Sequence, residues 1–392
     1  MTEHPLLPQS PRPHPNADVT ATHLPQGPRS IGDVEFGDVD GDGDLDAVLA
    51  DWGPGSPMKN EGACPRLWRN EGGRFVDATA GRVPDVAVRF CWELELVDVD
   101  NDFDLDLLVS SKRSPGSFLF HNDGDGDGTF TDVSAARLPQ FTNNYEFEPM
   151  DVDGDGFLDL VTINDGAGAR RFSEHLFVAD GKGGYFDATD ARWPQADNPR
   201  FDDNMIAFLD YESDGDADFL IASLNGIDRL LVNDGAGRFA AAAPVFDGER
   251  TRATLGLAIA DLNGDGRMDC VHAEGEVKNA EADKVFFGKA IAKDTAAPYV
   301  GPLSVERRGG RTLVRVRVHD RKSPCMPHDW REVTLLVGAG GEQRRVPLQW
   351  YGEYLWRAEV DADADADAPL RVVATDAAGN TARSPAGGAA RR

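Results

Sequence analysis

The chain has 392 residues, with 40 basic and 68 acidic groups, and its formal net charge is −28. Such an acidic protein repels nucleic-acid phosphates and anionic lipid headgroups and favours bound cations, so nucleic acid is not expected as a partner. The length predicts two domains, and 42 glycines and 24 prolines beside six methionines favour short strands over long helices.

The ends and the cysteines add limited information. Residues 1–16 are expected to form a flexible leader without the features of a signal peptide, and residues 385–392 a disordered tail. No apolar run is long enough to predict a membrane span. The four cysteines form no CxxC pair. Cys64 and Cys91 could form a disulfide, and free thiols are an equal alternative.

One nine-residue pattern, D-x-[DNE]-x-D-x-x-x-D, occurs five times. The copies are DVDGDGDLD, DVDNDFDLD, DVDGDGFLD, DYESDGDAD and DLNGDGRMD, and they begin at Asp38, Asp98, Asp151, Asp210 and Asp261. Their spacing of 51–60 residues is typical of one four-stranded propeller blade. Each copy lies between two apolar segments, and a further hairpin with Asn-Gly or Asp-Gly turns follows in most repeats, which predicts four strands per repeat.

The fifth repeat lacks its last strand. KVFFGKAIAKD, from Lys284 to Asp294, supplies a third strand only, whereas ADVTATHLPQ near the N-terminus matches TDVSAARLPQ, which ends a complete repeat. An N-terminal strand that completes the last blade would leave no open sheet edge. The sequence therefore predicts an all-β chain, with a five-bladed β-propeller over residues 17–293 that is closed by an N-terminal strand.

The acidic loops are predicted to bind about five Ca²⁺ ions, because dense carboxylate oxygens suit this large, flexible cation better than Mg²⁺, and the loops contain neither the Cys nor the His that zinc prefers. Position 12 is apolar or otherwise unsuited in every copy, which excludes an EF-hand. Solvated acidic turns without metal remain the alternative. The expected side-chain ligands are Asp38, Asp40, Asp42, Asp46, Asp98, Asp100, Asp102, Asp106, Asp151, Asp153, Asp155, Asp159, Asp210, Glu212, Asp214, Asp218, Asp261, Asn263, Asp265 and Asp269, and the expected backbone carbonyl donors are Asp44, Asp104, Phe157, Asp216 and Arg267.

Two loops depart from the common ligand set. The longer Glu212 is expected to distort the fourth site or to reach the ion through water, and Asn263 leaves the fifth site with three carboxylates and the weakest binding. The DGDGDG run from Asp123 to Gly128 is a further candidate for a cation.

These loops and the NDGxGxF turns resemble the FG-GAP/VCBS repeats of integrin α-subunits and bacterial surface proteins. The resemblance covers about residues 17–289 and implies a secreted or surface-exposed, calcium-stabilised binding scaffold, often for adhesion or glycan contact. Integrin-type propellers have seven blades, whereas this chain has five repeats. Loops that bind Ca²⁺ only at roughly 10⁻⁴–10⁻³ M would also fill outside the cell and not in the cytosol.

Residues 294–384 lack the acidic loops and contain alternating strands, which predicts a small β-sandwich. The opening DTAAP and the closing VVATDAAGN resemble bacterial immunoglobulin-like modules. DADADADA, from Asp361 to Ala368, is expected to be a solvated loop, with a cation site as the alternative.

Common catalytic motifs such as GxSxG, HExxH and Walker loops are absent. The leading interpretation is therefore a non-enzymatic, calcium-dependent scaffold that binds a protein or carbohydrate through loops on one propeller face, with a monomer as the simplest state. The alternative is a carbohydrate-active hydrolase or lyase with funnel carboxylates, and a third interpretation is a purely structural repeat in a larger surface assembly. The candidate acids of the enzyme are Glu93, Glu95, Glu146 and Glu148; weaker candidates are a metal set of Cys325, His328 and Asp329, and sugar-stacking by Trp52, Trp68, Trp92 or Trp193.

Overall fold

The computed structural model describes residues 18–27, 29–53, 61–113, 116–124, 126–164, 173–242, 246, 251, 253–275, 282–289, 291–338, 343–361 and 368–385. Almost all regular structure in these ranges is antiparallel β-sheet, as the sequence predicted. None of the helices in these ranges has the length and apolar character needed to cross a membrane.

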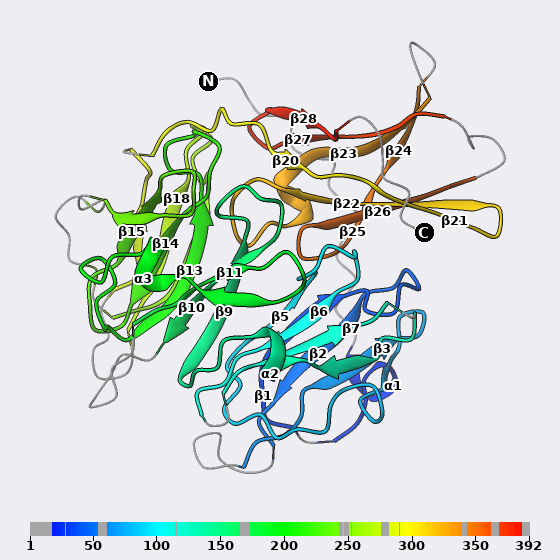
Figure 1. Cartoon of the computed structure of the whole chain (residues 1–392), viewed down its shortest axis with the longest axis horizontal. Helices are drawn as coiled ribbons and strands as arrows, with labels where there is room; N and C mark the ends of the chain where they lie inside the picture. The colour runs from blue at the N-terminus through cyan, green and yellow to red at the C-terminus, as the bar shows by residue number, and fades with distance from the viewer. Residues whose placement is uncertain are drawn as a thin grey trace.

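Five antiparallel sheets, here called repeat sheets one to five, follow one another along the chain (Figure 1). The first contains β1 (Ile31–Gly37), β2 (Asp46–Asp51), β3 (Arg66–Asn70) and β4 (Phe75–Asp77). The second contains β5 (Leu94–Val97), β6 (Asp106–Val109), β7 (Phe118–Asn122) and β8 (Phe130–Asp132). The third contains β9 (Asn144–Met150), β10 (Asp159–Asn164), β11 (Leu176–Ala179) and β12 (Tyr185–Asp187). The fourth contains β13 (Asp203–Leu209), β14 (Asp218–Ser223), β15 (Arg229–Asn233) and β16 (Phe239–Ala241), and the fifth β17 (Thr254–Ala260), β18 (Asp269–Glu274) and β19 (Lys284–Phe286).

Each acidic loop joins the first and second strands of its sheet. The last aspartate of the nine-residue pattern is the first residue of the second strand and pairs with the last residue of the first strand, as Gly37 does with Asp46. All five loops therefore lie at the same end of their sheets. The sequence prediction of strand, acidic turn and strand is confirmed.

The innermost strands pack in chain order, β1 against β5, then β9, β13 and β17. Buried apolar clusters fill the seams between successive sheets. At the two ends of the series, apolar side chains are exposed, including Val34 and Phe36 on β1 and Leu255 on β17. The described residues thus form a series of propeller-like sheets. Closure of these sheets into a ring stays a prediction.

The N-terminal segment that was expected to close the ring is only partly described. From residue 18 it forms α1 (Thr20–His23), which corresponds to α2 (Ser134–Arg137) and α3 (Thr189–Arg192) after the fourth strands of repeat sheets two and three. Within the described ranges, the hydrogen bonds of residues 18–26 are internal to that segment. The expected strand would precede α1 and lies outside the described residues.

The C-terminal module consists of two facing sheets. One contains β20 (Tyr299–Val300), β21 (Ser304–Arg308), β22 (Arg311–His319), β25 (Gln349–Gly352) and β26 (Leu355–Asp361). The other contains β23 (Trp330–Val337), β24 (Arg344–Pro347), β27 (Leu370–Asp376) and β28 (Thr381–Arg383), and a 3₁₀ turn, η1 (Pro327–Asp329), precedes β23. Alternate residues of both sheets form one apolar core, so this part is a β-sandwich.

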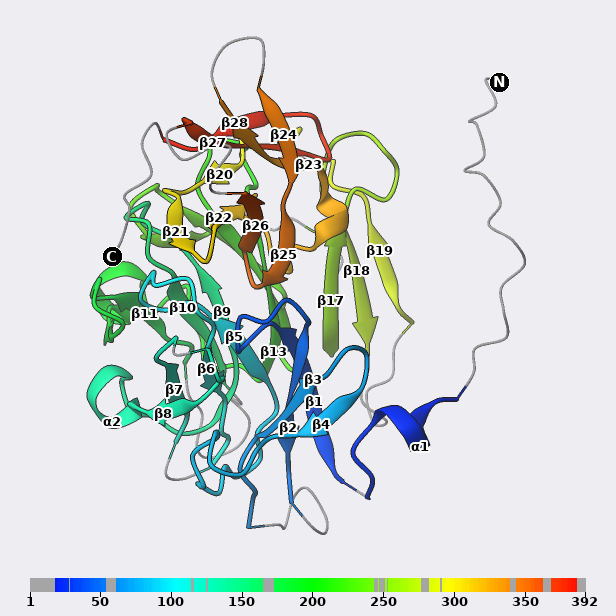
Figure 2. The ribbon, with the colours of Figure 1, turned by 90° about the vertical axis from the view of Figure 1, so that its right-hand side faces the viewer.

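The module sits on the end of the repeat sheets that carries the acidic loops, as Figure 2 shows. The turn between β25 and β26 enters the repeat region, where Tyr351 and Leu355 join the core of repeat sheets one and two and Tyr354 joins the next core. Gly352 is required at this contact, because a Cβ atom would lie 2.5 Å from the Leu105 side chain. The two modules therefore share buried surface.

Candidate functional site

The acidic loops have nearly the same backbone in all five repeats. The carboxylate at position 1 accepts backbone N–H groups from later in its own loop, as Asp210 does from Asp214 and Gly215. Positions 4 and 6 adopt positive φ, which glycine supplies in most copies. In the second loop Asn101 and Phe103 take these conformations, with φ of 62° and 73°. The pattern thus specifies a tight turn with its carboxylates drawn inwards.

The aspartate at position 9 fastens each loop to its sheet. In the first repeat one Asp46 oxygen accepts Val39 N–H at 3.1 Å and the other accepts Asn70 N–H at 2.8 Å. The corresponding pair of bonds recurs at Asp106, Asp159, Asp218 and Asp269. A position predicted only as a metal ligand therefore also organises the strand that follows.

Three loops bring carboxylates together as a cation site requires. In each, one oxygen from each of three aspartates lies within 4.8 Å of the others; the sets are Asp38, Asp40 and Asp42, then Asp98, Asp100 and Asp106, and then Asp151, Asp153 and Asp159. One buried oxygen each of Asp38, Asp100 and Asp153 has no hydrogen-bond partner among the described residues. Unsatisfied buried oxygens at this density fit a hard cation such as Ca²⁺.

The fourth and fifth loops are more open. Asp216 Oδ1 is buried without a hydrogen-bond partner in the described chain, although Asp216 was expected to contribute its carbonyl. Asp261, Asn263 and Asp265 are exposed. Neither loop forms a triplet as close as the other three within the described ranges. Weakest binding by the fifth loop stays a prediction.

Burial makes ionisation unfavourable at position 9 of the first and third loops. It raises the pKa of Asp46 to about 7 and that of Asp159 to about 8, even though backbone N–H groups bonded to them act in the opposite direction. A cation held by the loop would favour the ionised form.

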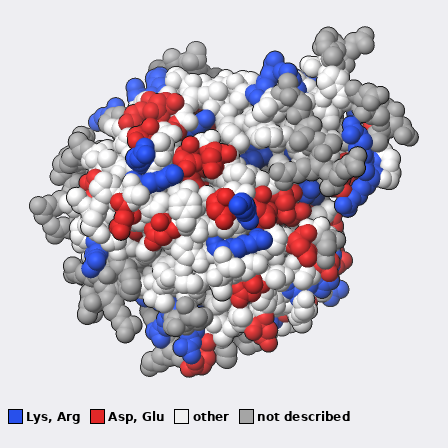
Figure 3. Space-filling view, viewed as in Figure 1, with Lys and Arg blue, Asp and Glu red and all other residues white. Residues whose placement is uncertain are grey.

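Arginines of the C-terminal module contact the same loops. Arg357 pairs with Asp38, Arg317 Nη2 lies 3.2 Å from Asp98 Oδ2, and Arg315 Nη1 lies 2.9 Å from Asp104 Oδ1. Figure 3 shows the resulting band of acidic side chains with basic groups among them, between the repeat sheets and the module. Sequence reasoning missed this interface. Its available signal was the alternation of arginine and valine in VRVRV, within an otherwise acidic chain.

A second group of carboxylates, here called the axial acid cluster, lines the innermost strands. It contains Asp33, Glu35, Glu93, Glu95, Glu146, Glu148 and, from the β25–β26 turn, Glu353. Oxygens of Glu93, Glu95 and Glu148 lie within 4.8 Å of one another. The four glutamates named from the sequence as possible funnel acids thus do face their neighbours across the innermost strands.

Three of these acids link consecutive repeat sheets. Asp33 accepts the N–H of Leu94 at 2.9 Å, Glu93 that of Phe147 at 3.2 Å and Glu146 that of Ile206 at 3.2 Å. At the next seam, the equivalent acceptor is the sulfur of Met205, 3.2 Å from Leu257 N. These side chains therefore have an evident structural role.

The axial acids are poorly solvated and repel one another. Desolvation raises the pKa of Glu35, Glu146 and Glu353 to about 8, with neighbouring carboxylates adding to the effect at Glu35 and Glu353. The pKa values of Glu93, Glu95 and Glu148 are also raised, first by burial and then by other acids. Ionisation of these acids is therefore unfavourable.

Aromatic rings gather at the other end of the strands. The ring centroids of Trp52, Phe90 and Trp92 lie 5.4–5.7 Å apart with planes within 23°, and the tilted Tyr145 ring lies 5.7 Å from Trp92. These four residues are here called the aromatic platform. Lys112 Nζ lies 4.6 Å from the Tyr145 ring centroid. Trp92 is 42% exposed and directly precedes the axial Glu93.

Three parts of the chain match a family model described as an FG-GAP-like repeat: residues 38–109, 98–162 and 210–272. Each match begins at one acidic loop and ends in the second strand of the next repeat sheet. The chain contains FG-GAP-like repeats. The resemblance inferred from the loops is thereby confirmed, while the immunoglobulin-like character of the C-terminal module stays a prediction.

No curated protein matches this FG-GAP repeat chain. Among solved structures, it is similar to the biofilm matrix protein Bap1 of V. cholerae, with 11% identity, a TM-score of 0.41 and coverage of 91% of this chain and 59% of that one. It is also similar to Sqt1 of Saccharomyces cerevisiae, with 10% identity, a TM-score of 0.35 and coverage of 87% and 81%. A third similar structure is a sialidase of Trypanosoma rangeli in complex with sialic acid, with 9% identity, a TM-score of 0.36 and coverage of 86% of this chain and 72% of that one. The chain thus spans about three fifths of Bap1.

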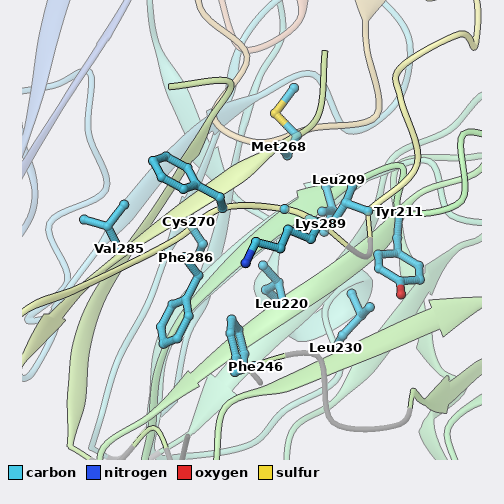
Figure 4. A pocket seen from close by; sticks show the side chains of 13 residues that line it. Leu209, Tyr211, Leu220, Leu230, Phe246, Met268, Cys270, Val285, Phe286 and Lys289 are labelled. Atoms are coloured by element: carbon cyan, nitrogen blue, oxygen red, sulfur yellow. The ribbon is translucent and has the colours of Figure 1, made fainter. Parts of the chain in front are cut away.

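An apolar cavity of about 240 Å³ lies between the fourth and fifth FG-GAP repeats (Figure 4). Leu209, Leu220, Phe246 and Phe286 contribute to its wall. In repeat sheet four the equivalent space is filled by Phe239 of the fourth strand, whose ring centroid lies 4.7 Å from that of Phe219. Repeat sheet five has no fourth strand in its described part and has the smaller Cys270 where Phe219 would be.

Cys270 in this wall belongs to a buried polar chain. Its Sγ lies 2.9 Å from His272 Nε2, and His272 Nδ1 lies 2.9 Å from Asp228 Oδ2. The order of thiol, imidazole and carboxylate is that of an activated nucleophile. Burial, however, raises the pKa of the Cys270 thiol, which opposes formation of a thiolate. These three side chains are therefore part of the packed core at this seam.

The remaining sequence candidates separate in space. Cys325 is buried whereas His328 is 79% exposed, so these two do not converge on a metal with Asp329. Trp193 is buried against Phe219 and Trp68 is half-buried on β3, which fits packing. All four cysteines are free. The suggested sites at residues 123–128 and 361–368 include positions outside the described residues.

Proposed function

We propose that this FG-GAP repeat protein is a calcium-dependent binding scaffold that acts outside the cell, and that its ligand contacts the aromatic platform. The carrying observation is the stack of Trp52, Phe90 and Trp92 on the face opposite the C-terminal module. The sequence predicted ligand contacts through loops on one propeller face without saying which, and the face opposite the acidic loops is proposed because the module and its arginines occupy part of the acidic-loop face.

Calcium has a structural role in this proposal. The first three loops supply converging carboxylates with unsatisfied oxygens, and all five are proposed to bind Ca²⁺ through the predicted residues. An ion bound only by the folded chain stabilises it by about 2.7 kcal/mol when its concentration is a hundredfold above Kd. Loops with Kd near 10⁻⁴–10⁻³ M would fill at roughly extracellular calcium concentrations, which supports the proposed location.

A carbohydrate is the ligand class that the platform fits best. A broad aromatic surface packs against the C–H face of a sugar ring, while polar groups at its edge bond the hydroxyls. Trp92 offers the exposed ring, the Tyr145 ring lies beside it, and the Lys112 ammonium donates to the Tyr145 hydroxyl. A protein ligand that inserts an apolar side chain is the other outcome of the test.

The axial acid cluster supports a second candidate function, hydrolysis or lysis of a carbohydrate bound at the platform. Oxygens of Glu93, Glu95 and Glu148 lie within 4.8 Å of one another, and such crowded acids favour shared protons over a separate acid and base. The raised pKa values of Glu95 and Glu148 also oppose a carboxylate nucleophile at neutral pH. Binding without catalysis is therefore preferred.

The test is glycan-array binding by the purified chain in millimolar Ca²⁺, followed by calorimetry on the best glycan. Trp92→Ala should weaken binding at least tenfold, and Phe186→Ala, which removes an exposed aromatic ring on β12, should leave it unchanged. Equal loss in both variants, or no glycan binding at all, would reject the carbohydrate site. Release of new reducing ends that Glu148→Gln abolishes would instead support the enzyme.

We also propose that the chain before residue 18 supplies the fourth strand of repeat sheet five. The match of residues 17–26 with the ends of other repeats, the formation of α1 and the exposed side chain of Val285 on β19 support this. Deletion of residues 1–17 should then lower the urea midpoint, whereas deletion of residues 386–392 should not. Equal midpoints for both would argue against strand exchange.

A further inference from the structure

Three aspartates meet at the junction between the repeat sheets and the C-terminal module. Asp294 lies in the linker after β19, Asp320 follows β22 and Asp376 ends β27. One oxygen from each lies within 4.8 Å of the others. The three are distant in sequence and belong to neither the acidic loops nor the axial acid cluster.

Asp376 gives the independent sign of a missing ligand. The residue is fully buried, and its Oδ1 accepts the N–H groups of Gly379 and Asn380, which fixes the side chain. The Asp376 carboxylate supplies one oxygen of the closely spaced group. Its Oδ2 has no hydrogen-bond partner in the described structure. An ionised oxygen buried in this way is strongly unfavourable unless a cation or donor satisfies it.

The space beside the three acids suits one small ligand. A cavity of about 20 Å³ is lined by Asp210, Asp294, Asp320 and Lys322 together with apolar side chains, and Asp376 lies outside this lining. About 10–15 Å³ is enough for one water-sized occupant. The cavity excludes a larger molecule.

Arg321 and Lys322 are positive groups near these acids, and each bonds another acceptor. Lys322 Nζ lies 2.8 Å from Asp329 Oδ1, and Arg321 Nη1 donates to the carbonyl of Ala297 at 2.7 Å. Asn380 Nδ2 donates to Asp294 Oδ1, which is one neutral contact. Burial and the mutual repulsion of the acids accordingly raise the pKa of Asp320 to about 8 and that of Asp294 to about 6.

We propose that Asp294, Asp320 and Asp376 bind a divalent cation, with Ca²⁺ favoured by the all-oxygen ligands. The ion would join the linker to two strand ends of the module. Because Asp294 N–H also donates to Gly266 O in the fifth acidic loop at 2.8 Å, the site would hold the module in place on the repeat sheets. This role is additional to the proposed loop ions and independent of the ligand at the platform.

The experiment counts calcium in the full chain after desalting, by mass spectrometry, and measures unfolding in Ca²⁺ and in EDTA. Asp320→Asn and Asp376→Asn should each lower the count by one, while Glu332→Gln, an equal charge change at an exposed ion pair on β23, should not. In EDTA, Asp320→Asn should be at least as stable as the unmodified chain because repulsion is relieved, and in Ca²⁺ it should gain less stability.

Asp376→Asn keeps an oxygen for the bonds from Gly379 and Asn380. If the Asp376 variant does not fold, Asp294→Asn in the linker takes its place. An unchanged calcium count in the folded Asp294 and Asp320 variants would overturn the proposal. If the junction variants lose one ion and keep the loop ions, the junction site is supported. If the loop assignment is wrong, Asp153→Asn leaves the calcium count unchanged, so the two failures can be told apart.

Discussion

Arg317 provides the most direct test of how the C-terminal module is held. Its guanidinium lies 3.2 Å from Asp98 Oδ2 and donates to the carbonyls of Asp98 at 2.8 Å and Gly156 at 3.2 Å. The side chains of Arg317 and Asp98 are only 4% and 1% exposed. Replacement by methionine keeps most of the volume and removes the charge together with these donors.

The expected destabilisation follows from burial. At 3.2 Å the charge pair is worth about 5 kcal/mol with an effective dielectric constant of 20, and part of this offsets the cost of removing both charges from water. Removal of one partner of a buried pair typically costs about 3–5 kcal/mol, because the other charge stays buried alone. We expect Arg317→Met to lower the free energy of unfolding by about 3 kcal/mol in EDTA.

The assay is urea unfolding followed by tryptophan fluorescence, with proteolysis of the linker as a second measure of docking. Arg311→Met is the matched control on the same strand: Arg311 is 55% exposed and its pairs with Glu359 and Asp361 are at the surface, so the change should be below about 1 kcal/mol. Added Ca²⁺ should reduce the effect of Arg317→Met, because a cation in the second loop also compensates Asp98. Equal, small effects of the two substitutions would refute the reasoning.

Three further predictions address the other features. Asp153→Asn should weaken calcium binding by the third loop at least tenfold, measured by calorimetry, while Asp234→Asn at an exposed turn should not; equal affinities would contradict the ligand assignment. Burial and Glu148 raise the pKa of Glu353 in the folded chain to about 8. The stability that its neutral form supplies is therefore fully present below the pKa of an unfolded glutamate and is lost as the pH rises through 8. Glu353→Gln should therefore gain stability relative to the unmodified chain between pH 5 and 9, by about 1–3 kcal/mol in urea unfolding, and a constant difference would oppose this. Gly352→Ala should cost about 1–3 kcal/mol, because the new methyl would lie 2.5 Å from Leu105; unchanged unfolding would show that the contact can relax.

The local structure could be predicted because it is repeated and short in range. The apolar alternation, the glycines at positive φ and the regular aspartates specify strands, turns and inward-facing carboxylates within a few residues of one another. For the same reason Asp38, Asp98 and Asp151 could be named as loop carboxylates before their geometry was known.

The contacts between repeats could be named only in part. Glu93, Glu95, Glu146 and Glu148 were recognised as acids in apolar strands, but an alternating strand does not reveal which neighbour its side chains meet. The acceptance of the next repeat's N–H by Glu93 depends on the angle between two sheets. The aromatic platform likewise combines Trp52 with Trp92 from the next repeat.

The sequence by itself determined the repeat, the strand and loop order, and the residues that line each acidic turn, because these follow from contacts between near neighbours along the chain. Only the tertiary structure decided which face of the repeats remains open. Arg317 and Asp98 are more than two hundred residues apart, and Asp294 meets Asp376 across the whole C-terminal module. Such pairs are formed by the docking of two folded units, whose relative position depends on the fit of complete buried surfaces.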